Sequence, residues 1–222
     1  MTLEELIARF RVLAKDAEQP YFWDDATVAM WLSDAQRQAC IRGRLLREDA
    51  NPLLCSIALT AGKNTYALHS AVYELIDLRI VPANGGRPRP LAIASREWLG
   101  ANDPDWRDSD REVRHVIQDD TSIRVVGRVE TGDVLRLECY RLPIKALETD
   151  ADKPEIHQAH HEHLIQWALA QAFSVVDAET LDPRRAQEAE GNFTRYFGPL
   201  PYSDMRRITR EDVSHHNEAI LP

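Results

Sequence analysis

The densest group of chemically active side chains in this sequence is a run of histidines near residue 160. The run contains His157, His160, His161 and His163, and a helix here would place His157 and His161 on one face, one turn apart. Two imidazoles at this spacing can both bind a zinc ion. A catalytic zinc site also needs a third ligand and side chains that orient the first two, and no HExxH or related motif supplies them. We therefore predict solvated or interface histidines, with a metal-dependent hydrolase that uses His157 and His161 as the alternative function.

A second candidate is the acidic stretch that contains Asp103, Asp105, Asp108 and Asp110. Carboxylate oxygens bind calcium, but the stretch lacks the central glycine and the final glutamate of an EF-hand loop. The sequence also has no GxSxG, P-loop or GxGxxG motif. We therefore predict a solvated loop here, and a protein with no catalytic site and no cofactor.

Aromatic side chains offer a third kind of site. Tyr21, Phe22 and Trp23 can stack on a base or a sugar, but such a triplet before a helix more often packs its loop onto the core. Trp98 and Trp106, if exposed, would suit a carbohydrate-binding or adhesion module. Carbohydrate binding is therefore the second alternative function.

Composition excludes several classes of protein. Hydrophobic residues make up 44% and charged residues 28% of the 222 residues, as in ordinary globular proteins. The net charge of −9 argues against a protein that wraps nucleic acid, although an acidic lining would let a duplex pass without sticking. No apolar run approaches the ~20 residues that span a bilayer, so we predict no membrane contact.

The amino terminus is acidic where a signal peptide would be basic, and this predicts synthesis in the cytoplasm. Cys40, Cys55 and Cys139 are odd in number and widely spaced. Such a set indicates neither a disulfide framework nor a zinc knuckle, and we predict buried, reduced thiols.

The candidate side chains are positioned by helices and strands, and the amino-terminal end is predicted to contain two helices. Thr2 to Glu5 form a capping box, and apolar residues at helical spacing continue the helix toward Pro20. Asp24 is the next N-cap candidate, and it opens a predicted helix over residues 25–46.

Helices return near the carboxyl end. Pro154 suits a first helical turn, and apolar spacing predicts a long helix over residues 155–178. Asp182 and Pro183 are an N-cap and first-turn pair that opens a helix to about Phe197.

Between these helices the pattern is typical of short strands separated by turns. Residues 54–59 and 65–68 suggest one hairpin around Gly62, and Gly132-Asp133 marks the turn of a final hairpin. Ser95 is a candidate cap for one short helical turn. Further strands are predicted over residues 75–81, 91–94, 113–117, 122–126 and 134–140. Because no βαβ rhythm is visible, we predict an all-β antiparallel sandwich or small barrel.

These elements predict an α+β protein. A discontinuous helical domain combines residues 1–50 and 151–198, and residues 51–150 form an inserted β-rich module. Residues 199–222 are expected to be an extended tail that needs a partner to order. The candidate partner-binding residues of this tail are Tyr202, Met205, Arg206, Arg207, Ile208, Val213, Ile220 and Leu221.

The order of several short segments resembles the head-to-tail connector, or adaptor, proteins of tailed bacteriophages and related gene-transfer particles. The segments are Trp31 to Ala39, Leu59 to Leu68 with its glycine turn and tyrosine, Asp103 to Arg107, Leu142-Pro143, and Pro154 to Leu169. The segments are short, and the resemblance depends on their collinear order to about residue 197.

The resemblance implies a virion protein that forms a ring, with twelve copies, between the portal of the capsid and the tail. Its implied partners are other copies of itself, the portal protein, a tail or further connector protein, and double-stranded DNA in passage. The absence of a recognised catalytic motif agrees with such a structural role. The portal is the partner that we expect for the tail residues 202–222.

Overall fold

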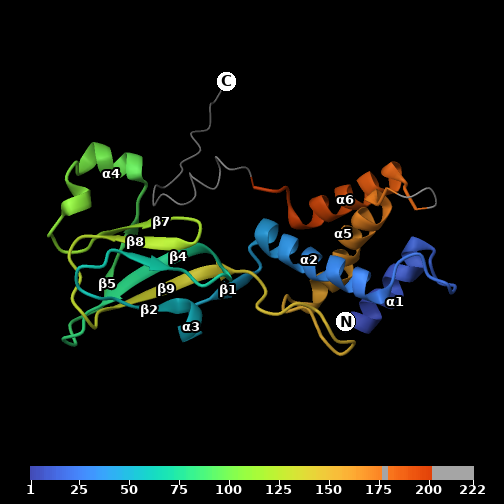
Figure 1. Ribbon diagram of the computed structural model, residues 1–222, viewed down its shortest axis with the longest axis horizontal. Helices are drawn as coiled ribbons and strands as arrows, with labels where there is room; N and C mark the ends of the chain where they lie inside the picture. The colour runs from blue at the N-terminus through green and yellow to red at the C-terminus, as the bar shows by residue number, and fades with distance from the viewer. Residues whose placement is uncertain (177–179, 202–222) are drawn as a thin grey trace, which may run out of the picture. The chain divides into compact units, whose positions relative to one another are not determined.

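The computed structural model describes residues 1–176 and 180–201 and divides the chain into two compact units (Figure 1). One unit combines residues 1–47 with residues 141–201 and is helical, whereas the other comprises residues 48–140 and contains most of the strands. The protein is therefore α+β, with helices at both ends and a strand-rich middle, as the sequence predicts. None of the described helices is both long and apolar enough to span a bilayer.

Four α-helices make up the helical unit, and each predicted N-cap is confirmed. The helices are α1 (Leu3–Ala14), α2 (Asp25–Gly43), α5 (His161–Ser174) and α6 (Pro183–Phe197). The Thr2 hydroxyl and the Glu5 carboxylate form the reciprocal capping box of α1. Asp24 caps α2 and Asp182 caps α6 through their carboxylates.

Helix α5 lies at the centre of this unit. It packs against α1, α2 and α6, and its buried residues include Leu164, Ile165, Ala168 and Phe173. A helix that is apolar over much of its circumference needs neighbours on several sides, and the first two helices supply them. The amino-terminal and carboxyl-terminal segments therefore share one hydrophobic core.

Helix α5 is shorter than the helix predicted over residues 155–178. A 3-10 turn over Gln158–His160 precedes it, and the α-helix begins at His161 and ends at Ser174. Pro154 and Glu155 lie before this turn.

A buried ion pair fixes the loop between α1 and α2. Arg11 Nη1 lies 2.8 Å from Asp16 Oδ2, and Arg11 Nη2 donates to the carbonyl of Trp23 at 3.0 Å. The Trp23 ring packs edge-on against Phe173 of α5, with 5.9 Å between ring centroids. The prediction that the aromatic triplet packs this loop onto the core is confirmed for Trp23, whereas Phe22 is 56% exposed.

Glu155 fastens the connection between the last strand and α5. Its carboxylate accepts hydrogen bonds from Arg141 Nη1 at 2.6 Å and from the backbone amides of Ile144 and Lys145 at 2.6 and 3.1 Å. Burial alone would raise the pKa of Glu155, but these three donors hold its pKa below the ordinary value. The Glu155 amide in turn donates to the side chain of Gln36 in α2.

The middle unit contains short strands and three helical turns. The strands are β1 (Leu46–Glu48), β2 (Ser56–Ala58), β3 (Thr65–Ala67), β4 (Val72–Val81), β5 (Arg89–Pro90), β6 (Ala92–Ile93), β7 (His115–Gln118), β8 (Ser122–Val126) and β9 (Val134–Arg141). The helical turns are α3 (Pro52–Cys55), α4 (Arg96–Asn102) and the 3-10 turn η1 (Trp106–Asp108). The expectation of an all-β module is therefore wrong, although Ser95 caps α4 as predicted.

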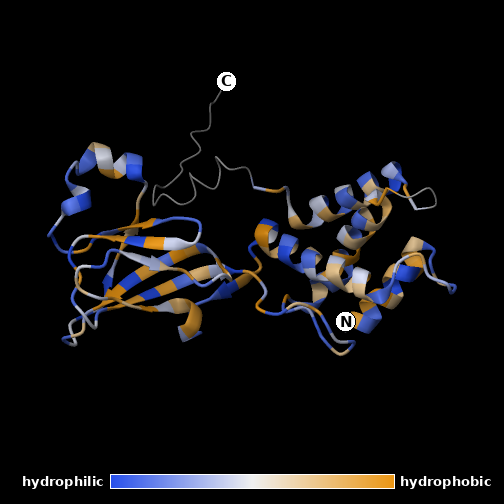
Figure 2. Ribbon diagram, viewed as in Figure 1, coloured by the Kyte–Doolittle hydropathy of each residue, from blue (hydrophilic) through white to orange (hydrophobic). Residues whose placement is uncertain are grey.

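The strands form two sheets that share one core. The first sheet has the order β1-β9-β4-β5 with β2 also paired to β9, and the second has the order β3-β8-β7-β6. Figure 2 shows hydrophobic and hydrophilic residues alternating along β4 and β9, as in strands with one buried face. Leu78 of β4, Leu135 of β9 and Val125 of β8 belong to the same buried cluster, which places the core between the sheets.

Both predicted hairpins are wrong. Strand β2 pairs with β9, whereas β3 pairs with β8, so the turn at Gly62 connects the two sheets. The segment around Gly132 also connects different sheets, because β8 and β9 belong to different ones. One pair, β6 with β7, is parallel, so the module is mixed where the sequence predicted an antiparallel one.

The three cysteines are buried and free, as predicted. Burial raises the pKa of the Cys40 thiol to about 12. A thiol with such a pKa is protonated at neutral pH and is a poor nucleophile.

Candidate functional site

The histidine run does not lie on one helical face. His157 precedes the 3-10 turn, and its Nδ1 accepts the amide of Ala159 at 3.1 Å. His161 is the first residue of α5 and is 4% exposed, with Nε2 bonded to the carbonyl of Ile156 at 2.9 Å. Its Nδ1 lies 2.9 Å from the α-amino group of Met1. His157 therefore lies outside α5, and both ring nitrogens of His161 are already hydrogen-bonded.

The other two histidines pack against Tyr196 of α6. His160 Nδ1 lies 3.1 Å from the Tyr196 hydroxyl, and the His163 ring stacks on the Tyr196 ring with 3.5 Å between centroids. Burial and the neighbouring histidines lower the pKa of His160. These side chains thus join α5 to α6, and residues 1–176 and 180–201 contain no group of three or more His, Cys, Asp or Glu side chains that could hold a metal ion.

The acidic stretch from Asp103 to Asp110 forms a loop around a buried tryptophan. Trp106 is only 3% exposed and packs with Leu99 and Val126, so it does not meet the condition of exposure that the carbohydrate-binding alternative sets. Asp103 pairs with Arg111 at 3.4 Å. Carboxylates that pair with arginine are less available for a calcium ion.

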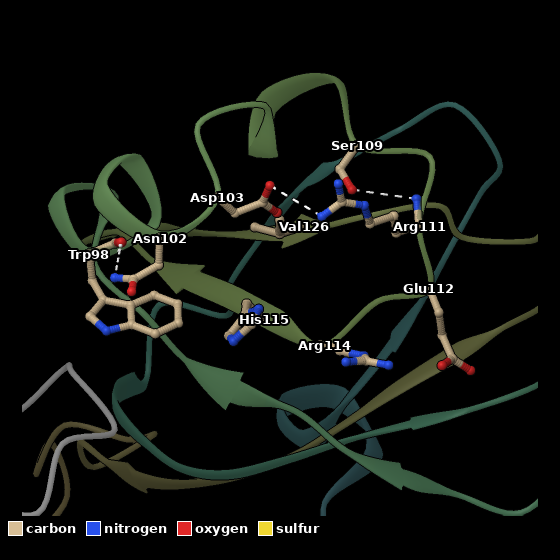
Figure 3. A pocket seen from close by; sticks show the side chains of 9 residues that line it. All are labelled: Trp98, Asn102, Asp103, Ser109, Arg111, Glu112, Arg114, His115 and Val126. Atoms are coloured by element: carbon tan, nitrogen blue, oxygen red, sulfur yellow. Dashed lines mark hydrogen bonds and ion pairs between the residues drawn. The ribbon is translucent and has the colours of Figure 1, made fainter.

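A cavity of about 440 Å³ lies beside this loop, within the middle unit (Figure 3). Helix α4, the acidic loop and strands β7 and β8 surround it. The lining residues are Trp98, Asn102, Asp103, Ser109, Arg111, Glu112, Arg114, His115 and Val126.

The register of the second sheet positions the floor of this cavity. His115 of β7 lies directly opposite Val126 of β8, so both side chains are on one face of the sheet. The Trp98 ring from α4 lies 5.2 Å from the His115 ring between centroids and is 41% exposed. Figure 3 shows His115 between Trp98 on one side and Arg114 on the other.

A close approach between two backbone segments, at Arg111 and at Gly127–Arg128, positions the arginine side of the cavity. The amide of Arg128 donates to the carbonyl of Arg111 at 2.8 Å. Gly127 has a φ of +119°, and a Cβ added there would lie 2.7 Å from the same carbonyl oxygen. Only glycine suits this backbone and this distance.

The sequence analysis found Trp98 but missed Arg111, Arg114 and His115 as members of one site. Their signal in the sequence is weak, because charged residues in a short strand are ordinary on a solvated sheet face. What joins them to Trp98 is the packing of α4 on this sheet, which is not a local feature.

A second surface feature lies on the helical unit, where exposed apolar side chains occur beside the α1–α2 and α5–α6 connections. Val12, Phe22 and Val176 are 60%, 56% and 89% exposed. The two connections are neighbours, because Arg185 at the start of α6 donates to the carbonyl of Leu13 at the end of α1 at 3.0 Å. Exposed apolar side chains of this kind can take part in protein–protein contact.

The tail residues predicted to bind a partner, Tyr202, Met205, Arg206, Arg207, Ile208, Val213, Ile220 and Leu221, lie outside the described residues.

An α+β chain with helices at both ends and a strand-rich middle is the architecture that the sequence pattern predicts. A comparison with protein-family models finds the SU10 adaptor protein over residues 1–215. Because this match extends through both units, the chain belongs to the SU10 adaptor protein family and is a structural head-to-tail adaptor of a bacteriophage virion. No curated protein is similar enough in sequence to count as a match.

Proposed function

We propose that this adaptor is one subunit of a ring that joins the portal of the capsid to the tail and surrounds the passage for DNA. The observation that carries the proposal is the family match, which includes residues 1–215 and hence both units. The number of subunits that we propose is twelve, in register with the portal. The ring subunits contact one another and a tail or further connector protein.

Two physical features support this role. The net charge of −9 gives a surface that repels the phosphates of a duplex, so DNA can pass without binding tightly. The exposed apolar side chains of Val12, Phe22 and Val176 offer area for contacts between proteins.

Inactivation of the gene tests the adaptor role directly. Phage that lack this protein should produce heads and tails that do not join, visible as separate particles by electron microscopy. Expression of the intact protein in the same host should restore tailed particles. Normal tailed particles without the protein would contradict the proposal.

We also propose that residues 202–222 bind the portal, with Tyr202, Met205, Arg206, Arg207, Ile208, Val213, Ile220 and Leu221 as the contact residues. The segment combines arginines with widely spaced apolar residues, which suits a peptide that docks on another protein. Deletion of residues 202–222 should abolish portal binding and leave the thermal melt by circular dichroism unchanged. Portal binding by the shortened chain would disprove this assignment.

The two alternative functions have their own tests. A zinc hydrolase would retain stoichiometric zinc after dialysis, and elemental analysis of the purified protein measures this. The hydrogen bonds of His161 to Ile156 and Met1 speak against it. A carbohydrate-binding module would bind a glycan array, and burial of Trp106 leaves Trp98 as the exposed tryptophan of the two first considered.

A further inference from the structure

The cavity beside Trp98 carries an arginine without a charge partner. Glu112 pairs with Arg89, and Asp103 pairs with Arg111 at 3.4 Å. Arg114 is exposed, and its guanidinium has no ion-pair partner among the described residues. The cavity therefore presents one unneutralised positive charge on a protein whose net charge is −9.

Flat rings lie beside this charge. Trp98 is 41% exposed, and the tilted pair of Trp98 and His115 forms one side of the cavity. Tryptophan and arginine are both enriched among the residues that contribute most to protein–protein binding. The Asn102 amide nitrogen donates to the carbonyl of Trp98 at 2.9 Å, which leaves the Asn102 side-chain oxygen as an acceptor for a ligand amide.

The cavity is also preformed. Leu99, Trp106 and Val126 pack together beneath α4, and the glycine at position 127 allows the backbone at Arg111 to approach strand β8. A site that is ordered before binding loses less conformational entropy when it binds.

We propose that this cavity binds an acidic segment of another protein, with a carboxylate side chain paired to Arg114 and the segment's backbone or aliphatic atoms against Trp98 and His115. Charge complementarity supports this occupant, because a carboxylate would neutralise Arg114. The proposal does not depend on which proteins the adaptor joins.

A protein segment fits the cavity better than nucleic acid does. Nucleic-acid binding needs several unpaired cations along a phosphate backbone. Here the arginine and glutamate or aspartate side chains that line the cavity are paired, apart from Arg114, so successive phosphates would meet one unpaired cation. A peptide needs only one carboxylate to pair with Arg114.

Binding can be measured by NMR titration of the full-length ¹⁵N-labelled protein at low ionic strength. The probe is N-acetyl-tetraglutamate amide, with N-acetyl-tetraglutamine amide as the uncharged control. The variant Trp98→Phe assigns the Trp98 indole signal. We expect tetraglutamate to give saturable shifts at the Trp98 indole and at the amides of Arg114 and His115, and tetraglutamine to give none.

Two variants show whether Arg114 is responsible. Arg114→Gln should weaken tetraglutamate binding about tenfold, which corresponds to loss of one charged hydrogen bond. Arg87→Gln removes an exposed arginine of the same unit that does not line the cavity, and it should leave the affinity unchanged. Unaltered dispersion of the amide spectrum verifies that both variants are folded.

Three results would overturn the proposal. They are the absence of saturable shifts with tetraglutamate, equal affinity in Arg114→Gln and the unsubstituted protein, and tighter binding of the oligonucleotide octathymidylate than of tetraglutamate at the same signals. The last result would assign the cavity to nucleic acid.

Discussion

Asp16 holds a carboxylate charge inside the helical unit. Its side chain is 1% exposed, and that of its partner Arg11 is 7% exposed. A buried ion pair is a poor source of stability as a pair, but without Asp16 the buried Arg11 guanidinium keeps only Asp25, whose side chain is 66% exposed, as a charged partner. The periodicity of α1 did not reveal Arg11 as buried, because a charged residue normally marks the solvent face of a helix.

Asp16→Ala should therefore lower the free energy of unfolding of the helical unit by about 3 kcal/mol. Urea denaturation followed by circular dichroism measures the change. Glu162→Ala is the matched control, since Glu162 belongs to the same helical unit, pairs with Arg9 at the surface and has a side chain that is 60% exposed. The control should lose less than about 1 kcal/mol, and equal losses in both variants would refute this account.

Glu155 makes the stability of the helical unit depend on pH. Its pKa in the folded protein lies below the ordinary value of 4.5, despite the opposing effect of burial. A depressed pKa contributes stability above the unfolded value, and this contribution is lost as the pH falls through the folded value. Glu155→Gln should thus be destabilised relative to the unsubstituted protein at pH 7, with a difference that shrinks as the pH falls below the ordinary value of 4.5. A difference that stays constant over this range, measured by urea denaturation, would show that Glu155 is not ionised in its bonded state.

At the scale of elements, local signals and distant pairings behave differently. The N-caps at Thr2, Asp24, Ser95 and Asp182 were predictable, because a cap depends on residues within one turn. The hairpin around Gly62 was not, because the choice of β8 and β9 as partners depends on a core that forms far along the chain. The cavity depends on the same distant packing, which is why Trp98 and Asp103 were singled out in the sequence but were not recognised as parts of one site.

Gly127 offers a test of how the cavity wall is built. Gly127→Ala should lower the free energy of unfolding by about 1–3 kcal/mol. The φ of Gly127 is positive, and the added Cβ would lie 2.7 Å from the carbonyl oxygen of Arg111. Gly100→Ala is the control, since Gly100 lies in α4 and a Cβ there meets no atom within 4 Å. This control should be neutral or stabilising by up to about 1 kcal/mol, as alanine favours helices. Thermal melts that rank the two variants in the opposite order would contradict the structure.

At the scale of the whole molecule, the chain has separate cores for its two units. The helical core combines both ends of the sequence, whereas the core of the middle unit draws on residues 54–139. Strands β1 and β9 are neighbours in one sheet, so the chain enters and leaves the middle unit through adjacent strands. Such an arrangement suits a module inserted into a helical domain, which stays a prediction from the order of helical and strand patterns along the sequence.

A fragment of residues 44–142 includes every strand from β1 to β9 and should therefore fold alone. We expect a dispersed amide NMR spectrum and one cooperative transition in urea. A collapsed spectrum would show that the middle unit needs the helical unit for its stability.

The most direct test of the adaptor assignment is native mass spectrometry of the purified protein mixed with the portal of the same phage. The account predicts a closed complex in which each portal ring carries twelve copies of this chain. A protein that remains unbound when the portal ring is intact would contradict the central claim.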